Sequence, residues 1–284
     1  MAANLNSIKN RIGVVNNTKK ITHAMELVAA SKLRKAKAKY QGIQEYKHLL
    51  SSTFDSLMNQ INTSEFKLVF PDHKDVEARL FLVITSDLGL CGSYNSNVMN
   101  LLKENLNSKD KVILFGSKGL STWKSWNLDN EVVASFTNYG DEIGYKIANL
   151  LAKKVLTLYR NKEVKSINII YTEFVNNVFQ DAKNLQLIPF VLDENKVTKK
   201  SPVHFEPNSQ TVLSNAIPLY ISSQIYSLGL SSKVSELASR RNAMENATDN
   251  AHNLLNDLNL EYNHKRQSAI TQEINEIVSG ADAT

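Results

Sequence analysis

Hydrophobic residues recur every three or four positions over about the first sixty residues of this chain. If the chain is followed from Leu5 to Ile61 in alternating steps of three and four residues, thirteen of the seventeen positions reached are apolar. A 3.5-residue period keeps one stripe of a helix against a partner helix, so it is typical of a coiled coil. No proline interrupts the pattern, which predicts one helix roughly 85 Å long. The positions of this seam are Leu5, Ile8, Ile12, Val15, Lys19, Thr22, Glu26, Ala29, Leu33, Ala36, Tyr40, Ile43, Lys47, Leu50, Phe54, Leu57 and Ile61.

The seam is polar from Lys19 to Glu26. In this stretch the apolar residues Ile21, Met25 and Val28 lie on another face of the same helix. One interpretation is a local stutter in the coiled coil. The other is that this turn contacts something besides its partner helix, and the pattern by itself leaves both open.

A second long helix is predicted near the end of the chain. Pro218 is expected to kink or restart it, because proline lacks an N–H and clashes one turn back. From Leu219 to Ser279 the helix would span roughly 90 Å, and Gly280 is a suitable residue to end it. Its seam is mostly apolar as far as Tyr262 and then polar, through Val234, Leu237, Arg241, Met244, Thr248, Ala251, Leu255, Leu258, Tyr262, Lys265, Ala269, Gln272 and Glu276.

Short β-branched runs alternate with helical patterns in the middle of the chain, which indicates a mostly parallel α/β sheet. The stretch Asp193–Pro207 reads as a linker. Predicted strands are Arg79–Thr85, Lys111–Gly116, Val132–Phe136, Ile167–Phe174 and Leu185–Val191. Predicted helices between them are Ser96–Leu106, Ser117–Ser125 and Asp141–Arg160.

These zones predict the fold class α/β: a long antiparallel coiled coil of the N- and C-terminal helices with a central, mostly parallel, Rossmann-like α/β domain. The predicted divisions are an N-terminal coiled-coil helix over 1–62, an α/β domain over 75–200 and a C-terminal coiled-coil helix over 208–284. The last helix ends in a polar segment that extends beyond the part it can bury against the first helix. We expect that end to lie in solvent or inside another protein.

Composition narrows the class of protein further. A hydrophobic fraction of 42% is too high for a disordered chain. The single cysteine, Cys91, excludes an internal disulfide framework and suggests a reducing compartment. There is no apolar run of about 20 residues and no apolar segment near Met1. We therefore expect a protein that is soluble or is held at a membrane through a partner.

The strongest enzyme-like signal is the turn from Thr85 to Asn95, between a predicted strand and a predicted helix. It fits neither G-x-G-x-x-G nor the P-loop, in which a lysine reaches the phosphates. Cys91 has no histidine nearby in sequence to activate it, and no residue spacing indicates a metal site. We read the turn as structural and expect no catalytic residues, no cofactor and no metal.

Basic residues are unevenly distributed along the chain. The net charge of +5 and the pI of about 9.0 do not by themselves indicate one kind of partner. Five basic residues fall between Lys32 and Lys39, namely Lys32, Arg34, Lys35, Lys37 and Lys39. Such a face is either simply solvated or binds an acidic partner, which includes nucleic acid, anionic lipid and acidic protein loops. Tyr40 is the only aromatic residue close by, which argues against nucleic acid.

Several segments spread over the whole chain form a recognisable set. They are RI at 11–12, TKKITHAMELVAASKL at 18–33, SDLGLCG at 86–92, SRRNAM at 239–244, ATDNA at 247–251 and YNHKRQSAITQEINEIVSGA at 262–281. In these segments the chain resembles the γ subunit of F-type ATP synthases. It departs from the family's usual residues at Leu88, Arg241, His23 and Ser222, which bears on individual contacts rather than on the fold.

The resemblance implies a non-catalytic rotor shaft in a rotary ATP synthase. The shaft would stand inside a hexamer of α and β subunits, couple nucleotide turnover to rotation of the membrane c-ring and to proton transport, and join the ε subunit. It would be peripheral, at the cytoplasmic face of the cell membrane. The polar break from Lys19 to Glu26 would then face the hexamer. The residues implied to contact β-subunit loops are Met25, Lys32, Arg34, Lys35, Arg266, Gln267, Thr271 and Glu273.

Three other functions compete with this one. The closest is the rotor of an F-type-like ATPase dedicated to motility or other mechanical work. The second is a nucleotide-using hydrolase with helical arms, which would bind nucleotide as an isolated chain. The third is a coiled-coil nucleic-acid binder, whose binding would depend steeply on salt.

Overall fold

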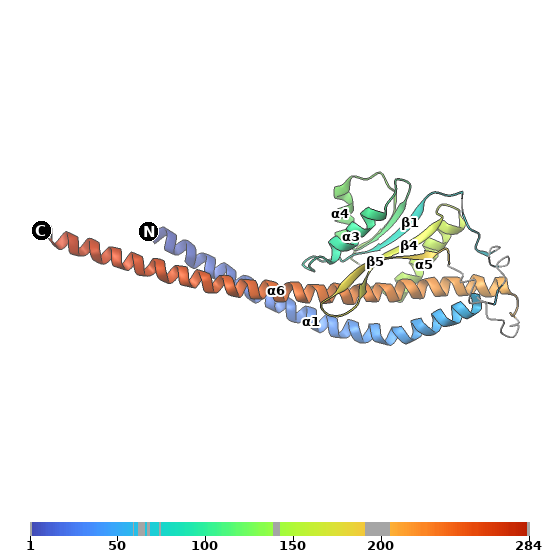
Figure 1. Ribbon diagram of the computed structural model, residues 1–284, viewed down its shortest axis with the longest axis horizontal. Helices are drawn as coiled ribbons and strands as arrows, with labels where there is room; N and C mark the ends of the chain where they lie inside the picture. The colour runs from blue at the N-terminus through green and yellow to red at the C-terminus, as the bar shows by residue number, and fades with distance from the viewer. Residues whose placement is uncertain are drawn as a thin grey trace. The chain divides into compact units, whose positions relative to one another are not determined.

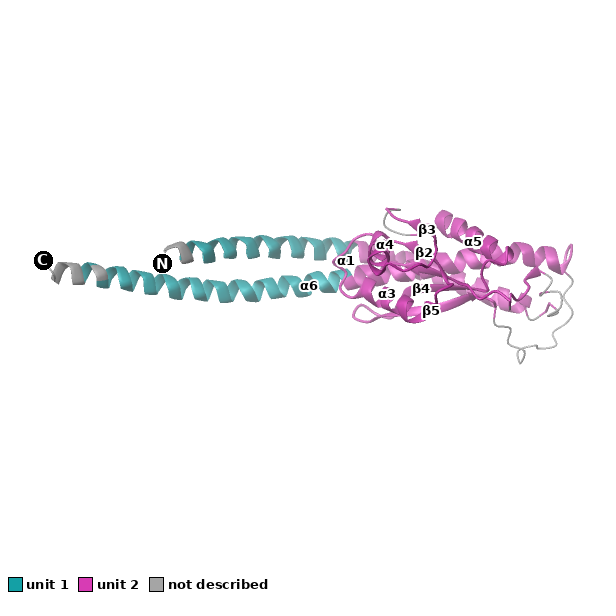
Figure 2. Ribbon diagram, turned by 90° about the horizontal axis from the view of Figure 1, so that it is seen from above, with its two compact units in different colours: residues 1–31, 240–284 teal, residues 32–239 magenta. Residues whose placement is uncertain are grey.

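The computed structural model describes residues 2–58, 60–61, 66, 69–73, 75–138, 143–190 and 205–282. The chain forms two compact units, one of residues 1–31 with 240–284 and the other of residues 32–239 (Figure 2). Helices α1 (Ala2–Met58) and α6 (Ser209–Asp282) each contribute to both units. The sequence division into 1–62, 75–200 and 208–284 follows elements instead, and it stays a prediction.

Unit 1, of residues 1–31 and 240–284, is an antiparallel pair of helices (Figure 2). Thr22 faces Thr248, with their hydroxyls 2.8 Å apart, and Lys19 Nζ lies 3.1 Å from His252 Nδ1. The numbers therefore rise along α1 as they fall along α6. Ile8 and Ala29 are buried on one helix and Met244, Ala251, Leu255 and Leu258 on the other, which confirms the predicted coiled coil.

The polar part of the seam keeps its register. Its three polar residues are all partly buried, as seam positions should be: Lys19, Thr22 and Glu26. Ile21 and Val28 are more than half exposed. The stutter interpretation is therefore wrong, because the seam continues through polar side chains while apolar ones point outward.

Unit 2, of residues 32–239, is built on a five-stranded sheet in the order β3-β2-β1-β4-β5. Four strands are parallel and β5 runs antiparallel to β4, which confirms the mostly parallel sheet. The strands are β1 (Arg79–Ile84), β2 (Lys111–Phe115), β3 (Val132–Phe136), β4 (Ser166–Phe174) and β5 (Gln180–Ile188).

Alternating side chains of the strands bury the two faces of the sheet under different helices. On one face, Phe81 and Val83 of β1 pack with α3 (Tyr94–Asn105) and α4 (Ser117–Trp126). On the other, Leu80 and Leu82 pack with α5 (Tyr145–Arg160) and with the first part of α6. The sheet is thus one layer between two helical layers (Figure 1).

The second part of α1 lies against α6 within unit 2. Leu33 packs on Val234 and Leu237, and the ring of Phe54 stacks on Tyr220 with centroids 4.1 Å apart. This contact continues the predicted seam, since the residues of α1 involved are all seam positions. Burial of these apolar side chains holds the helix pair to the α/β layers.

Three details of the prediction are corrected. Helix α6 begins at Ser209 and runs through Pro218, and its last assigned residue is Asp282 rather than one before Gly280. Leu213, Ile217 and Ile221 are fully buried around Pro218, so packing outweighs the lost backbone bond there. Strand β5 begins at Gln180, ahead of the predicted Leu185, because its polar residues lie on an exposed edge. The start of the predicted helix at Asp141 and residues 193–204 of the predicted linker lie outside the described residues.

Candidate interaction surfaces

The turn after β1 is closed by its own side chains. Asp87 Oδ1 accepts hydrogen bonds from Ser117 N and Ser117 Oγ, at 2.9 and 2.7 Å, at the start of α4. A helix N-terminus is where a phosphate would bind in such a fold, but here the protein's own carboxylate takes that place. Gly116 has a φ of 101°, and a Cβ there would lie 2.4 Å from the carbonyl oxygen of Thr85. The turn is therefore a close packing arrangement, as the sequence predicts.

Asp87 is the acidic group of this turn whose pKa is perturbed. Partial burial favours its neutral form, but hydrogen bonds from the Ser117 hydroxyl and the amides of Asn138 and Ser117, with the charge of Lys233, outweigh burial. The net effect lowers the pKa of Asp87. The carboxylate is thus held ionised as a structural acceptor rather than tuned to transfer a proton.

Cys91 is buried and lies among polar groups of the same turn. Asn95 Nδ2 is 3.2 Å from its sulfur, and Ser86 Oγ is 3.7 Å away. No histidine is among the hydrogen-bond partners that the structure gives this thiol. No group of three or more metal-ligating side chains occurs in the described ranges either.

The basic run of α1 divides into two kinds of residue. Lys32, Arg34, Lys35 and Lys39 are exposed. Lys37 is partly buried: its Nζ donates a hydrogen bond to Asn177 Oδ1 at 2.6 Å and lies 4.7 Å from the ring centroid of Phe174. Lys37 therefore belongs to an internal contact of unit 2, and grouping it with its exposed neighbours as one basic face was wrong.

An uncovered apolar face follows α1 through unit 1. Val14, Ile21 and Val28 recur every seven residues on this face and are each more than half exposed, whereas Met25 beside them is partly buried. Large aliphatic side chains gathered in this way on one helix usually mark a contact with another protein. Of the apolar residues that the sequence places away from the seam, Ile21 and Val28 are thus at the surface and Met25 is partly buried.

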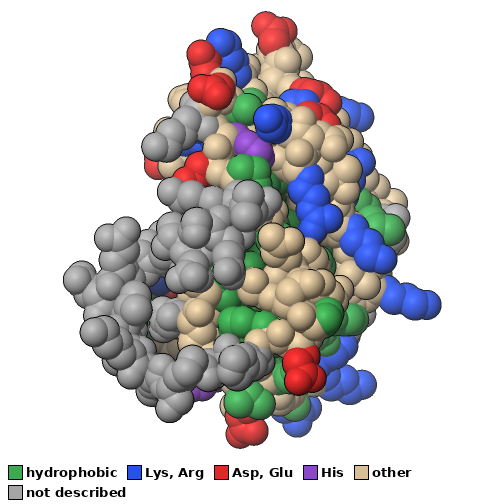
Figure 3. Space-filling model, turned by 90° about the vertical axis from the view of Figure 1, so that its right-hand side faces the viewer, with side chains coloured by type: hydrophobic (Ala, Val, Ile, Leu, Met, Phe, Trp, Pro, Cys, Tyr) green, Lys and Arg blue, Asp and Glu red, His purple; other side chains and the backbone are tan. Residues whose placement is uncertain are grey.

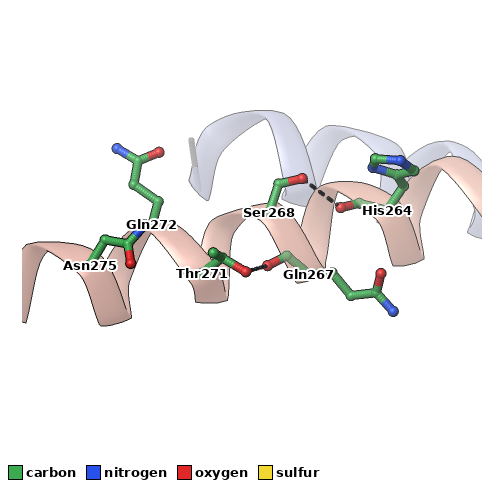
Figure 4. A pocket seen from close by; sticks show the side chains of 6 residues that line it. All are labelled: His264, Gln267, Ser268, Thr271, Gln272 and Asn275. Atoms are coloured by element: carbon green, nitrogen blue, oxygen red, sulfur yellow. Dashed lines mark hydrogen bonds between the residues drawn. The ribbon is translucent and has the colours of Figure 1, made fainter.

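The far end of α6 carries a groove of about 410 Å³ lined only by polar side chains (Figure 4). Ser268 Oγ donates to the carbonyl oxygen of His264 at 3.0 Å, and Thr271 Oγ1 to that of Gln267 at 2.9 Å. The two hydroxyls are thereby turned back onto their own helix. The lining also carries the imidazole of His264 and the side-chain amides of Gln267 and Asn275. The lining is His264, Gln267, Ser268, Thr271, Gln272 and Asn275.

The same tail has an apolar stripe. Ile270, Ile274, Ile277 and Val278 are 48%, 54%, 72% and 54% exposed. Their spacing of four, three and one places them on one helical face. The seam of α6 is buried as far as Leu258 and only partly buried at Tyr262 and Ala269, and this stripe begins directly after them.

The predicted contact residues fall in three places. Met25 lies in unit 1, whereas Lys32, Arg34 and Lys35 lie on α1 in unit 2. Gln267 and Thr271 line the polar groove, and Arg266 and Glu273 are exposed on the same tail outside its lining. Sequence reasoning did not single out His264, Ser268 and Asn275, although uncharged polar residues three and four apart could have indicated them.

Other surfaces offer less. A groove of about 490 Å³ in unit 2 is lined by Val69, Pro71, Tyr159, Arg160, Gln210 and Ser214. Tyr159 Oη donates to the carbonyl of Pro71 at 3.0 Å, so its hydroxyl is already paired. Figure 3 gives a space-filling view of one side of the molecule, where most Lys and Arg side chains lie over the right-hand half. None of the helices described is both long and apolar enough to cross a bilayer.

Taken together, these features define a class: a protein with two long helices, which pair in a coiled coil and also pack in an α/β domain, and with uncovered surfaces on those helices. The family model for ATP synthase matches residues 4–284. The ATP synthase gamma chain of Mycoplasmopsis synoviae strain 53 is 46% identical over 287 residues, covering 99% of both chains. The chain belongs to the family of ATP synthase gamma chains.

Two solved structures of ATP synthases also resemble this chain. The central stalk of the Tetrahymena thermophila mitochondrial ATP synthase matches with a TM-score of 0.62 and 27% identity, over 80% of this chain and 99% of that one. The rotor of the Euglena gracilis mitochondrial enzyme matches with a TM-score of 0.72 over 95% of this chain and 100% of that one. At 16% identity the Euglena match bears on the fold alone.

Proposed function

We propose that this chain is the central rotor shaft of an F-type ATP synthase. It couples ATP synthesis or hydrolysis in an α/β hexamer to rotation of the membrane c-ring and to proton transport. Family membership over the whole chain supports this role. The relatives named above are ATP synthase chains, and nothing in them favours the alternative role in motility.

The observation that carries the proposal is the tail of α6. Beyond Leu258 the seam is at most partly buried, yet the helix continues to Asp282 with an apolar stripe and a polar groove exposed on it. A helix with large aliphatic side chains left uncovered gains stability by entering another protein. The central opening of a hexamer provides such surroundings on every side of the helix.

Two kinds of contact with the β subunits follow. Exposed Lys32, Arg34 and Lys35 suit acidic loops, which they attract through a screened electrostatic interaction. Arg266, Gln267, Thr271 and Glu273 suit loops near the tip of the shaft, and Met25 suits a contact near the middle of unit 1. Because the residues around the shaft differ in charge and polarity, three identical β subunits would meet three different surfaces.

That asymmetry is sufficient for coupling. If each orientation of the shaft binds the alternative β conformations with different free energies, turnover of nucleotide and rotation drive each other. The chain itself needs no catalytic residue for this. The closed turn at Asp87 supports a non-catalytic role, since the N-terminus of α4 is already occupied by a carboxylate.

The remaining partners are the ε subunit and the c-ring, which would hold the α/β domain and the lower coiled coil. The chain would then be peripheral, at the cytoplasmic face of the cell membrane, through the complex alone. On the side that Figure 3 shows, both basic and acidic side chains are exposed, which is compatible with a protein partner.

Reconstitution tests the proposal. The α, β and ε subunits of the same organism are assembled with and without this chain, bound to vesicles containing the membrane ring, and supplied with ATP. We expect ATP-driven proton uptake only when the chain is present, and loss of uptake when residues after Tyr262 are removed. Proton uptake that does not need the chain would refute the role as coupling shaft.

A further inference from the structure

The carboxyl end of β4 extends past its neighbour in the sheet. The pairing of β1 with β4 ends at Val83 and Ile170, whereas β4 continues to Phe174. Backbone groups on that side of Thr172 and Phe174 therefore have no strand to bond. A buried backbone group without a partner is costly, so something else has to satisfy them.

Serine side chains of α6 take the place of the missing strand. Thr172 N donates to Ser232 Oγ at 3.1 Å, and Phe174 N donates to Ser231 Oγ at 3.0 Å. Ser235 Oγ donates to the carbonyl of Thr172 at 3.3 Å. The three serines are at most 3% exposed. The hydroxyl of Tyr94 also lies 2.9 Å from Ser232 Oγ, which ties α3 to the same point.

The residues that follow β4 are bound to α1. Lys37 Nζ donates to Asn177 Oδ1 and lies over the ring of Phe174, as described above. The ring of Tyr40 meets that of Phe174 edge to face, with centroids 6.5 Å apart. The segment from Thr172 to Asn177 is thus bonded to both long helices of unit 2.

Directional contacts suit this place for a mechanical reason. Twisting a helix against a sheet is a sliding displacement, which the area-dependent hydrophobic effect opposes only through the surface it exposes, because that effect is non-directional. A hydrogen bond weakens steeply when its donor angle falls or its distance grows. Buried hydroxyls bonded to a strand therefore add a directional restraint on the register of the helix to the restraint that close packing supplies.

We propose that this contact is the joint through which torque passes between the shaft helices and the α/β domain. The joint consists of Thr172, Phe174 and Asn177 with Ser231, Ser232 and Ser235 of α6 and Lys37 of α1. The proposal rests on the proposed rotor function. It makes the serines and Lys37 positioning residues, since they act by fixing the angle between shaft and domain and touch no reacting group.

The chain provides a matched control for the serines. Ser227 lies one helical turn before Ser231, is 1% exposed, and its Oγ has no hydrogen-bond partner among the described residues. The test variants are Ser231→Ala and Ser232→Ala, and the control is Ser227→Ala. All three changes remove one buried hydroxyl, but only the test variants leave an amide of β4 without its acceptor. Lys37→Met tests the α1 side, where a partly buried residue can change without emptying the core.

The first measurement is amide hydrogen exchange in the full-length chain, which does not depend on rotor function. We expect exchange at Thr172 and Phe174 to accelerate roughly tenfold when the serine bonded to each is removed, from the free energy of one hydrogen bond. Ser227→Ala should leave both amides at the wild-type rate. Equal exchange rates of these two amides in the test and control variants would refute the proposed joint.

The second measurement is the angular spread of a probe on the α/β domain of the assembled complex while the catalytic head is stalled. We expect a broader distribution for Ser231→Ala, Ser232→Ala and Lys37→Met than for wild type and Ser227→Ala. Faster exchange with an unchanged angular spread would show an attachment that transmits no torque, and so would overturn the proposal. A wild-type complex that does not rotate at all would instead refute the proposed function, whatever the exchange data show.

Discussion

Removing the apolar stripe of the α6 tail should weaken assembly while leaving the chain itself stable. The change is Ile270→Ser, Ile274→Ser and Ile277→Ser together. Serine and isoleucine have similar helix propensities, so the substitutions mainly remove apolar surface. In the isolated chain these side chains are 48%, 54% and 72% exposed, and little stability should be lost.

The magnitude follows from the area still available for burial. Full burial of an isoleucine contributes about 1.5–3 kcal/mol, and somewhat more than half of that remains to be gained in the complex. Three residues then amount to about 3–5 kcal/mol, or roughly two to four orders of magnitude in the dissociation constant. Titration of labelled chain into the catalytic head measures this directly. Leu150→Ser, at a residue of α5 that is 55% exposed, is the control and should bind as wild type.

The refuting result is binding of the triple variant with the affinity of wild type. It would mean that the stripe stays in solvent in the complex, and that the tail does not enter the head. A variant that unfolds on its own would contradict the exposure of these side chains. Thermal unfolding of the isolated chain, recorded beside the titration, distinguishes the two cases.

Three further predictions follow from single features of the chain. Asp87→Asn should lower stability at neutral pH and reduce the loss of stability on acidification below the ordinary pKa of 3.8. The reason is that a carboxyl group whose pKa is lowered by folding stabilises the fold above its unfolded pKa, and this stability is lost as pH falls through the folded pKa. Urea unfolding from pH 7 to 2.5 measures the effect, and parallel plots of stability against pH for the two proteins would contradict it. Arg34→Gln with Lys35→Gln should change stability little, since exposed charges contribute little, but should weaken the salt dependence of the assembled ATPase; identical rates at every ionic strength would mean that this face is only solvated. The chain alone should not bind ATP, because Asp87 occupies the start of α4, and micromolar binding in calorimetry would show that this reading of the turn is mistaken.

Much of the fold follows from local pattern. The seam of α1 was predictable because each side chain on a helix has a fixed direction, so a period of 3.5 residues places one stripe on the partner. Strands β1 and β2 are almost wholly buried and read as continuous apolar runs. The first half of β5 was missed because Gln180–Asn184 lies on an edge and shows no apolar run. Its strand form depends on pairing with β4, which no local window contains.

The surfaces were harder to predict than the fold. Lys37 resembles its exposed neighbours in the basic run, and only the fold brings Asn177 and Phe174 to it. The serines of α6 have a weak signal in their spacing, since Ser227, Ser231, Ser235 and Ser239 recur every four residues. That spacing places them on one face of a helix, but it does not reveal which strand they meet. A single sequence does not predict which distant segments come into contact in the fold.

Rotation of the α/β domain relative to a fixed catalytic head tests the central claim most directly. Cys91 is buried, so a surface cysteine introduced as Lys124→Cys on α4 can carry a probe selectively. With the hexamer attached to a surface and ATP supplied, we expect the probe to turn in one direction, in three equal steps per revolution if three β sites act in sequence. A probe that stays fixed while the head hydrolyses ATP at its full rate would contradict the account of this chain as the rotor.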